Sequence, residues 1–122
     1  MSLHDRPTVE ELLAAVREYL TKEVAATEDR RARFRALIAA NVLAVAEREL
    51  GRGGADAAAE DAALTELGYS AGAADARRRE LAAAIRSGEF DAPARFDAAL
   101  AYAREMVVRK LAVSNPRYDL SP

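Results

Sequence analysis

Residues 34–45 read FRALIAANVLAV, and this stretch decides the fold class. Its bulky residues recur three or four positions apart, with alanines between them. This spacing places the bulky side chains on one face of an α-helix, whereas a strand would need strict alternation of apolar and polar residues. The stretch therefore predicts an amphipathic helix, which we expect to begin after Thr27 as its N-cap and to end before Gly51 at its C′ position.

Helical spacing or capping signals recur along the rest of the chain, and no segment alternates as a strand would. Thr8 and Glu11 form the pattern of a capping box, and Asp91 followed by Pro93 is typical of another helix start. The sequence therefore predicts an all-α bundle of about five helices. The expected helices are 9–24, 28–50, 56–67, 75–87 and 92–114.

The helices over 9–24, 28–50 and 92–114 carry the main apolar stripes, so we expect them to form the main core, with the other two packed at one side. Alanine supplies 30 of the 122 residues. Because alanine buries little apolar area, the helices must pack closely around a few bulky residues. The residues expected to meet in this core are Phe34, Ile38, Val45, Phe96, Leu100 and Val107.

We expect residues 5–122 to form a single helical domain, and residues 1–4 to be disordered or derived from a cloning vector. The chain has no signal-peptide pattern and no apolar run of about 20 residues that could span a bilayer. These features predict a cytoplasmic protein that does not bind membranes.

The residue types that most enzymes and metal sites need are scarce. The chain has no cysteine, and its one histidine, His4, lies near the N-terminus. Zinc and iron sites draw mainly on His and Cys, and nucleophilic triads need at least one of them. The sequence therefore predicts no catalytic residues, no metal site, no cofactor and no enzymatic activity.

Asn41 interrupts the apolar stripe of the helix over 28–50. A buried amide without a partner costs about 1–3 kcal/mol, so we expect Asn41 to be buried and hydrogen-bonded. A structural amide is the main interpretation, and a ligand contact in a pocket between helices and simple exposure to solvent are the alternatives.

Arg77, Arg78 and Arg79 follow a glycine-containing turn and give a faint helix-turn-helix outline. The net charge is −2 and acidic residues interleave with the arginines, which argues against nucleic acid as a partner. A DNA-binding regulator that uses this arginine-rich helix stays an alternative function, as does a small-ligand-binding bundle.

Five apolar or aromatic residues exceed what the bundle needs for its own packing. They are candidates for contact with a protein partner, or for a homodimer interface, since two-fold dimers are the commonest assembly. These residues are Leu43, Tyr102, Met106, Tyr118 and Leu120.

Three segments carry a resemblance to a known family: DRPTVEELL at 5–13, AANVLA at 39–44 and RKLAVSNPRY at 109–118. Together they resemble a bacterial family of small helical domains of unknown function. Its members are encoded beside, or fused to, aminoglycoside-phosphotransferase-like kinases, often near acyl-CoA dehydrogenases. The resemblance implies no catalytic residues, but it implies a kinase-like phosphotransferase as partner. We therefore expect a non-catalytic accessory or protein-interaction module.

Overall fold

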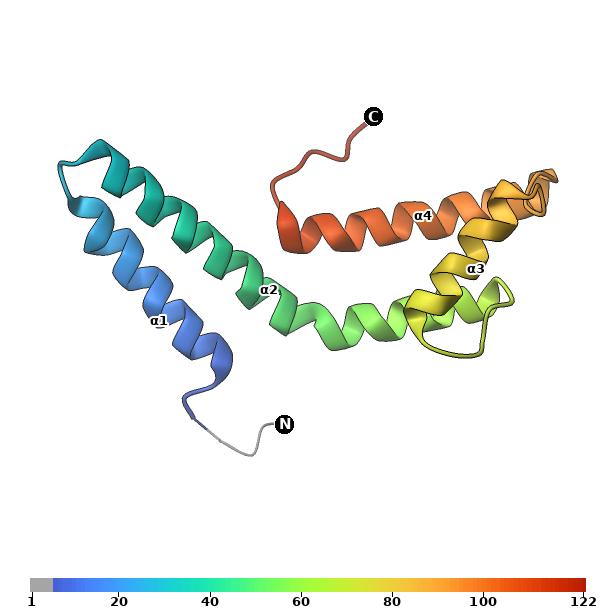
Figure 1. Cartoon of the computed structure of the whole chain (residues 1–122), viewed down its shortest axis with the longest axis horizontal. Helices are drawn as coiled ribbons and strands as arrows, with labels where there is room; N and C mark the ends of the chain where they lie inside the picture. Colours follow the sequence, from blue (N-terminus) through green and yellow to red (C-terminus); the bar gives the residue numbers. More distant parts are fainter. Residues whose placement is uncertain (1–5) are drawn as a thin grey trace. The chain divides into compact units, whose positions relative to one another are not determined.

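The computed structural model describes residues 6–122, and these residues form helices without a strand (Figure 1). The all-α class is confirmed, but the described residues hold four α-helices where five were expected. The expectation for residues 1–4 falls outside the described residues. In chain order the elements are α1 (Val9–Lys22), the 3-10 helix η1 (Val24–Ala26), α2 (Arg30–Glu66), α3 (Ala74–Arg86) and α4 (Pro93–Ser114).

The helix starts were predicted with mixed success. The capping box of α1 is confirmed, because Thr8 Oγ1 accepts the N–H of Glu11 at 3.1 Å while the Glu11 side chain accepts the N–H of Thr8 at 3.4 Å. The N-cap expected at Thr27 was wrong. Asp29 caps α2 instead, since its carboxylate accepts the N–H of Arg31 at 3.0 Å. The carboxylate is the better acceptor for the partial positive charge at a helix start.

The N-cap of α4 is Ala92, without a side-chain hydrogen bond, so the expected cap at Asp91 was also wrong. Pro93 occupies the first turn as predicted. Its missing N–H is harmless there, and its fixed φ suits the helix.

The helix break expected at Gly51 was wrong. The segments 28–50 and 56–67 belong to one helix of 37 residues, and Gly51, Gly53 and Gly54 lie inside it without a positive φ. A glycine inside a helix costs about 1 kcal/mol relative to alanine, which lowers helix stability but does not forbid the conformation. Arg, Ala and Glu flank the three glycines, and these strong helix formers carry α2 through.

The glycine that does end α2 is Gly68, with φ +102°. The N–H of Tyr69 donates to the carbonyl of Leu64 at 2.9 Å, and the N–H of Gly68 donates to that of Thr65 at 3.0 Å. This is a Schellman motif, which requires a left-handed residue at the C′ position.

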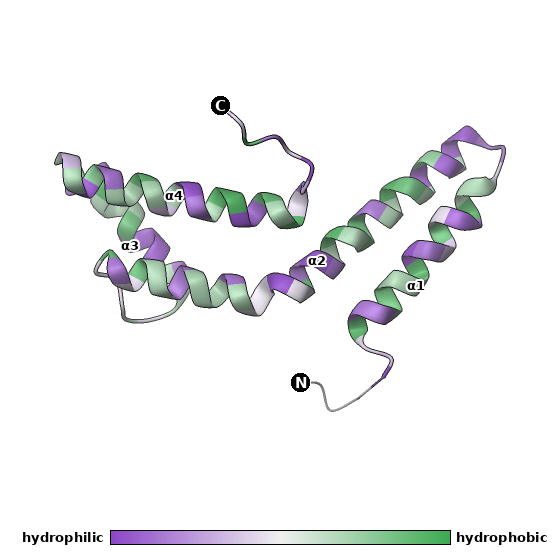
Figure 2. Ribbon diagram, turned by 180° about the vertical axis from the view of Figure 1, so that it is seen from behind, coloured by the Kyte–Doolittle hydropathy of each residue, from purple (hydrophilic) through white to green (hydrophobic). Residues whose placement is uncertain are grey.

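The chain divides into two compact units, Met1–Gly53 and Gly54–Pro122. In unit 1, α1 runs antiparallel beside the first half of α2 (Figures 1 and 2). Arg17 Nε donates to Glu47 Oε2 at 2.6 Å and links the two helices. The buried residues of α2 in this unit are Ala36 and Ala40. Small side chains at these positions allow the two backbones to approach closely.

The buried cluster of unit 2 joins the second half of α2, α3 and the segment before α4. It consists of Leu64, Leu81, Ala84 and Phe90, and Leu64 is fully buried. Partly buried residues pack against it from the segment just after α2 and from α4. These are Leu67, Tyr69, Ala99 and Tyr102.

The expected core was therefore wrong. None of the six residues expected to meet lies in the buried cluster, and five of them are exposed: Phe34, Ile38, Phe96, Leu100 and Val107. The periodicity located the apolar stripes, but it could not tell which side of each helix a neighbour would cover. In the first half of α2 the side with Ala36 and Ala40 is buried, whereas the side with Phe34 and Ile38 is exposed.

No helix among residues 6–122 is long and apolar enough to cross a membrane.

Candidate functional site

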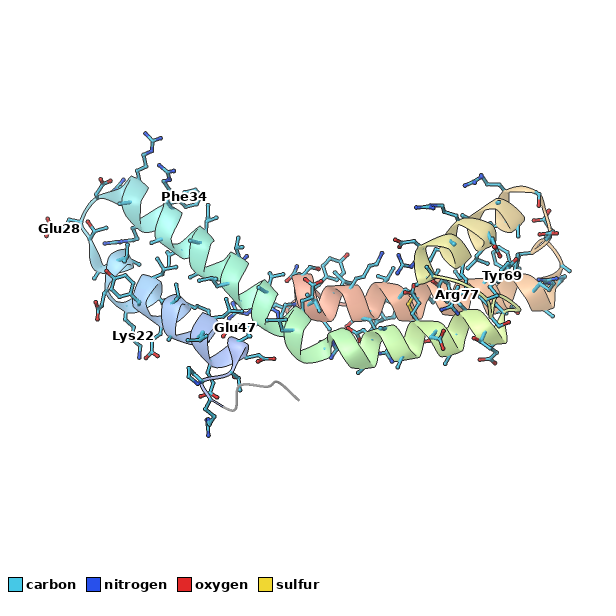
Figure 3. The ribbon with its side chains drawn as sticks, turned by 60° about the horizontal axis from the view of Figure 1, so that its bottom comes forward. Lys22, Glu28, Phe34, Glu47, Tyr69 and Arg77 are labelled. Atoms are coloured by element: carbon cyan, nitrogen blue, oxygen red, sulfur yellow. The ribbon has the colours of Figure 1, made fainter. Side chains whose placement is uncertain are left out.

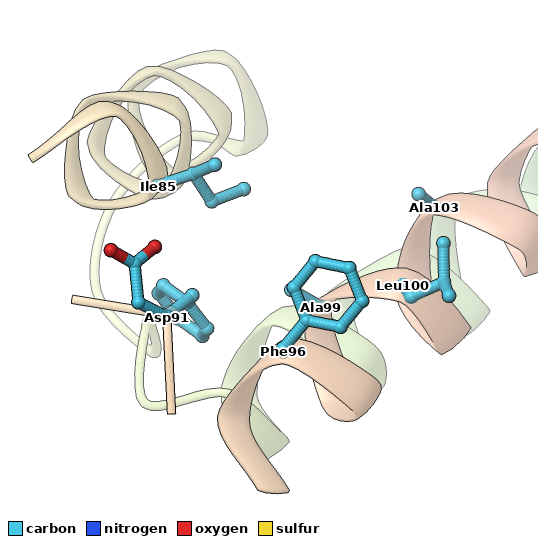
Figure 4. Close-up of a pocket in the computed structure, with 7 residues that line it drawn as sticks. Ile85, Asp91, Phe96, Ala99, Leu100 and Ala103 are labelled. Atoms are coloured by element: carbon cyan, nitrogen blue, oxygen red, sulfur yellow. The ribbon is translucent and has the colours of Figure 1, made fainter. Parts of the chain in front are cut away.

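In unit 2, two adjoining clefts open between α3 and α4 and share Ile85, Ala99 and Ala103. The first has a volume of about 240 Å³ and the second about 340 Å³. Figure 4 shows Ile85 of α3 facing Phe96 and Leu100 of α4 across the first cleft. Together the two clefts form one groove along α4, which we call the α3–α4 groove.

The walls of the groove are mainly apolar. Phe96 is 54% exposed and Val107 is 51% exposed, although both are large apolar side chains. Phe96, Leu100, Ala103 and Val107 recur at helical spacing, so they lie on one face of α4. The opposite wall is Ile85, itself about half exposed. A continuous exposed apolar surface of this kind is typical of a binding site for another molecule.

One end of the groove is polar and holds a three-residue network. Arg78 donates to Glu60 twice, from Nε and from Nη2, each at 2.8 Å. The Tyr102 hydroxyl donates to Glu60 Oε2 at 2.9 Å. Lys110 also lines this end. The three elements α2, α3 and α4 are thus tied together beside the groove.

The network fixes the protonation states of its members. The hydrogen bonds from Arg78 are the main cause that lowers the pKa of Glu60, and burial opposes them. Burial, together with the hydrogen bond to Glu60, raises the pKa of Tyr102 from 10.0 to about 12. A general acid or base works best with a pKa near the operating pH. The pKa of Glu60 moves further below neutral pH and the pKa of Tyr102 moves further above it. The pair is therefore better suited to holding the three helices together than to proton transfer.

We expect Tyr102 to titrate later than an ordinary tyrosine. Its pKa is raised on folding, so its contribution to stability is fully present below about pH 10 and is lost as the pH rises toward about 12. Phenolate absorbance, followed with pH and corrected by subtracting the Tyr102→Phe curve, should show a midpoint near 12. Circular dichroism in parallel checks that the fold persists.

Glu60→Gln supplies the control for this titration. The substitution removes the negative charge that opposes phenolate formation, while the glutamine carbonyl oxygen can still accept the Tyr102 hydroxyl, so the midpoint should fall below that of the wild type. A wild-type midpoint at 10 in the folded protein would contradict the network.

The residues predicted as partner contacts fall in different places. Tyr102 and Met106 line the α3–α4 groove. Leu43 lies in unit 1, partly buried, and Tyr118 and Leu120 lie half exposed in the tail after α4. Sequence reasoning singled out none of Ile85, Glu60 and Phe96 as site residues. The apolar stripe of α4 was visible in the sequence, but it was assigned to the core.

The expectation that Asn41 is buried was wrong, because the residue is exposed. Asn41 follows the buried Ala40 by one position, which turns it about 100° away from the buried face of α2. Its amide can therefore be satisfied by water, and no buried partner is needed.

The three arginines of α3 are used very differently. Arg77 is buried, and it donates to Asp61 at 2.6 Å and to the carbonyl of Tyr69 at 3.2 Å. Arg78 is held by Glu60 and also pairs with Asp75 at 2.7 Å. Arg79 is exposed. Two of the three guanidinium groups are thus engaged inside unit 2.

Among the described residues, no group of His, Cys, Asp and Glu side chains could hold a metal ion.

Residues 25–118 match the model of a protein family described as a domain of unknown function, DUF6285. The match covers α2, α3 and α4 and reaches into the tail. It includes two of the three segments that carry the resemblance noted above, 39–44 and 109–118, whereas the segment 5–13 precedes it. No curated protein and no solved structure matches the chain.

Proposed function

Since the chain belongs to the DUF6285 family, whose function is unknown, we propose that it acts as a non-catalytic protein-binding module with the α3–α4 groove as its binding surface. The observation that carries this proposal is the exposed apolar face of α4 opposite Ile85. A groove of this type fits the apolar face of an amphipathic helix, which is a common mode of peptide recognition.

The charges at the two ends of the groove give the partner helix a direction. Asp91 lines the end near the start of α4. Lys110 gives the other end its positive charge, because Arg78 there is already paired with Glu60. A helix that carries basic residues at one end and acidic residues at the other would match these charges in only one orientation. Such charges contribute more to specificity and association rate than to affinity.

The resemblance to proteins encoded beside aminoglycoside-phosphotransferase-like kinases supports a kinase-like phosphotransferase as the partner. In this proposal the protein is a bacterial, cytoplasmic accessory of an enzyme that handles acyl or alcohol substrates. The chemistry belongs to the partner, because the groove of this chain presents carboxylate and phenol groups that are already paired.

Val107→Asp should weaken binding to a phosphotransferase-like enzyme encoded beside the gene in the native host by at least tenfold. The charge would enter the apolar wall, and burying an unpaired carboxylate on binding is strongly unfavourable. Isothermal titration calorimetry with the two purified proteins measures the effect. Because Val107 is already 51% exposed, the substitution should leave the free protein folded.

Ala101→Asp is the matched control. Ala101 lies on the same helix and is exposed, but it lines neither part of the groove, so its substitution should leave the affinity unchanged. Equal losses for the two variants would place the interface elsewhere. A salt-dependent mobility shift on random duplex DNA, without binding to the enzyme, would favour the DNA-binding alternative instead.

A further inference from the structure

In unit 1, α2 carries an apolar stripe on the side away from α1. We call this stripe the outer stripe, and it consists of Phe34, Ile38, Val42 and Val45. Successive members are four, four and three residues apart, so they lie on one face of the helix. Phe34 is 64% exposed, Val42 is 61% exposed and Ile38 is about half exposed. The buried Ala36 and Ala40 fall on the opposite side by helical geometry. Figure 3 shows Phe34 on the side of α2 away from α1.

Opposite charges stand at the two ends of the outer stripe. Arg31 and Glu49 are 18 residues apart, which is five full helical turns, so they lie along one line with the stripe. Both residues are exposed. A face with a positive charge at one end, a negative charge at the other and apolar residues between them is complementary to itself when two copies run antiparallel.

We propose that the outer stripe binds a second copy of this chain, with the two α2 helices antiparallel about a two-fold axis at the level of residue 40. In that register Ile38 meets Val42 of the second copy, and Arg31 meets Glu49 of the second copy. Parallel pairing would instead set Arg31 against Arg31 and Glu49 against Glu49. The charges thus select the antiparallel orientation.

The length of the stripe sets the strength of this dimer. Residues 31–49 span roughly 27 Å at 1.5 Å per residue, and only one helix face takes part. The buried area per copy then lies below the roughly 800 Å² of a standard interface, so the dimer should dissociate in the micromolar range. This inference concerns unit 1 and does not rest on the proposed function, which uses the groove of unit 2.

Sedimentation velocity on the full chain, over a concentration series through the micromolar range at low salt, tests the proposal. The wild type should shift from monomer to dimer. Arg31→Glu alone and Glu49→Arg alone should each weaken the dimer at least tenfold, because like charges then meet at both ends of the interface. The double variant R31E/E49R should regain the wild-type behaviour. Arg31 and Glu49 are exposed in the single chain, so these substitutions should leave it folded. Circular dichroism of each variant checks that the helix content is unchanged.

The orientation has its own test, because the natural chain has no cysteine. A mixture of the single variants R31C and E49C should form a disulfide-linked heterodimer under mild oxidation, while R31C alone should stay largely unlinked. Linkage of R31C to itself would overturn the antiparallel register. A wild type that stays monomeric at every concentration would overturn the proposal. The outer stripe would then be covered by another part of the same chain or by a different protein.

Discussion

Leu64→Ala should remove about 2–5 kcal/mol from the free energy of unfolding, a large share of a typical domain stability of about 5–15 kcal/mol. Leu64 is fully buried and belongs to the only buried apolar cluster that the structure describes in unit 2. Its neighbours Leu81, Ala84 and Phe90 are held on helices and a tight turn, so they can collapse only partly into the space. The effect should therefore lie in the upper half of that range.

Urea denaturation measures this loss. Tyrosine fluorescence is a suitable probe, because Tyr69 and Tyr102 both pack against the cluster and the chain has no tryptophan. The matched control is Phe96→Ala, which removes a larger side chain from a position that is 54% exposed. This control should cost clearly less than Leu64→Ala, since about half of the Phe96 side chain stays in water on folding. If Phe96→Ala cost more than Leu64→Ala, the core assignment would be wrong.

Asp61→Ala should destabilise the protein more than Arg77→Met, although the two residues form one ion pair. The Arg77 side chain is 6% exposed and that of Asp61 is 65% exposed. Removing Asp61 leaves a buried guanidinium without its counter-charge, and breaking a buried pair in this way is strongly destabilising. We expect a loss of about 2–4 kcal/mol, below the full value for a buried pair because water reaches the Asp61 side.

Arg77→Met should cost less than about 1 kcal/mol. Methionine fills a similar elongated space with an adaptable apolar chain, and the Asp61 carboxylate that remains is well hydrated. The substitution also removes the buried Nε of Arg77, which has no hydrogen-bond partner among the described residues. Urea denaturation of the two variants gives the comparison. A larger loss for Arg77→Met would mean that the guanidinium holds the turn at Tyr69 through its hydrogen bond to the carbonyl.

Local signals predicted the fold class and several helix ends well. The capping box of Thr8 and Glu11 and the position of Pro93 depend on residues within one turn, and the structure confirms both. The course of the chain through Gly51 was mispredicted because a glycine permits a helix end without requiring one. Gly68, where α2 does end, shows the left-handed backbone that favours glycine.

The burial pattern was harder to predict, because it depends on which neighbour covers each stripe. The segment 56–67 was expected to pack at one side of the main core, since it lacks a main apolar stripe. Leu64 is nevertheless fully buried, because Leu81, Ala84 and Phe90 from α3 and the turn after it enclose it. The apolar face of Phe96 and Val107 was correctly recognised as a face, but it lines an open groove instead of a core. The sequence did not single out Glu60, because its partners Arg78 and Tyr102 lie 18 and 42 residues away along the chain.

The three glycines inside α2 have a consequence for cooperativity. A Cβ atom at Gly51, Gly53 or Gly54 would meet nothing within 4 Å, so steric crowding does not account for glycine at these positions. Together they weaken the helix by about 2–3 kcal/mol relative to alanine, at the boundary between the two units. Because the helix is weakened there, the unfolding of one unit should be only weakly coupled to the unfolding of the other. The chain should therefore unfold as two cooperative blocks, with the glycines marking where the first transition ends and the second begins.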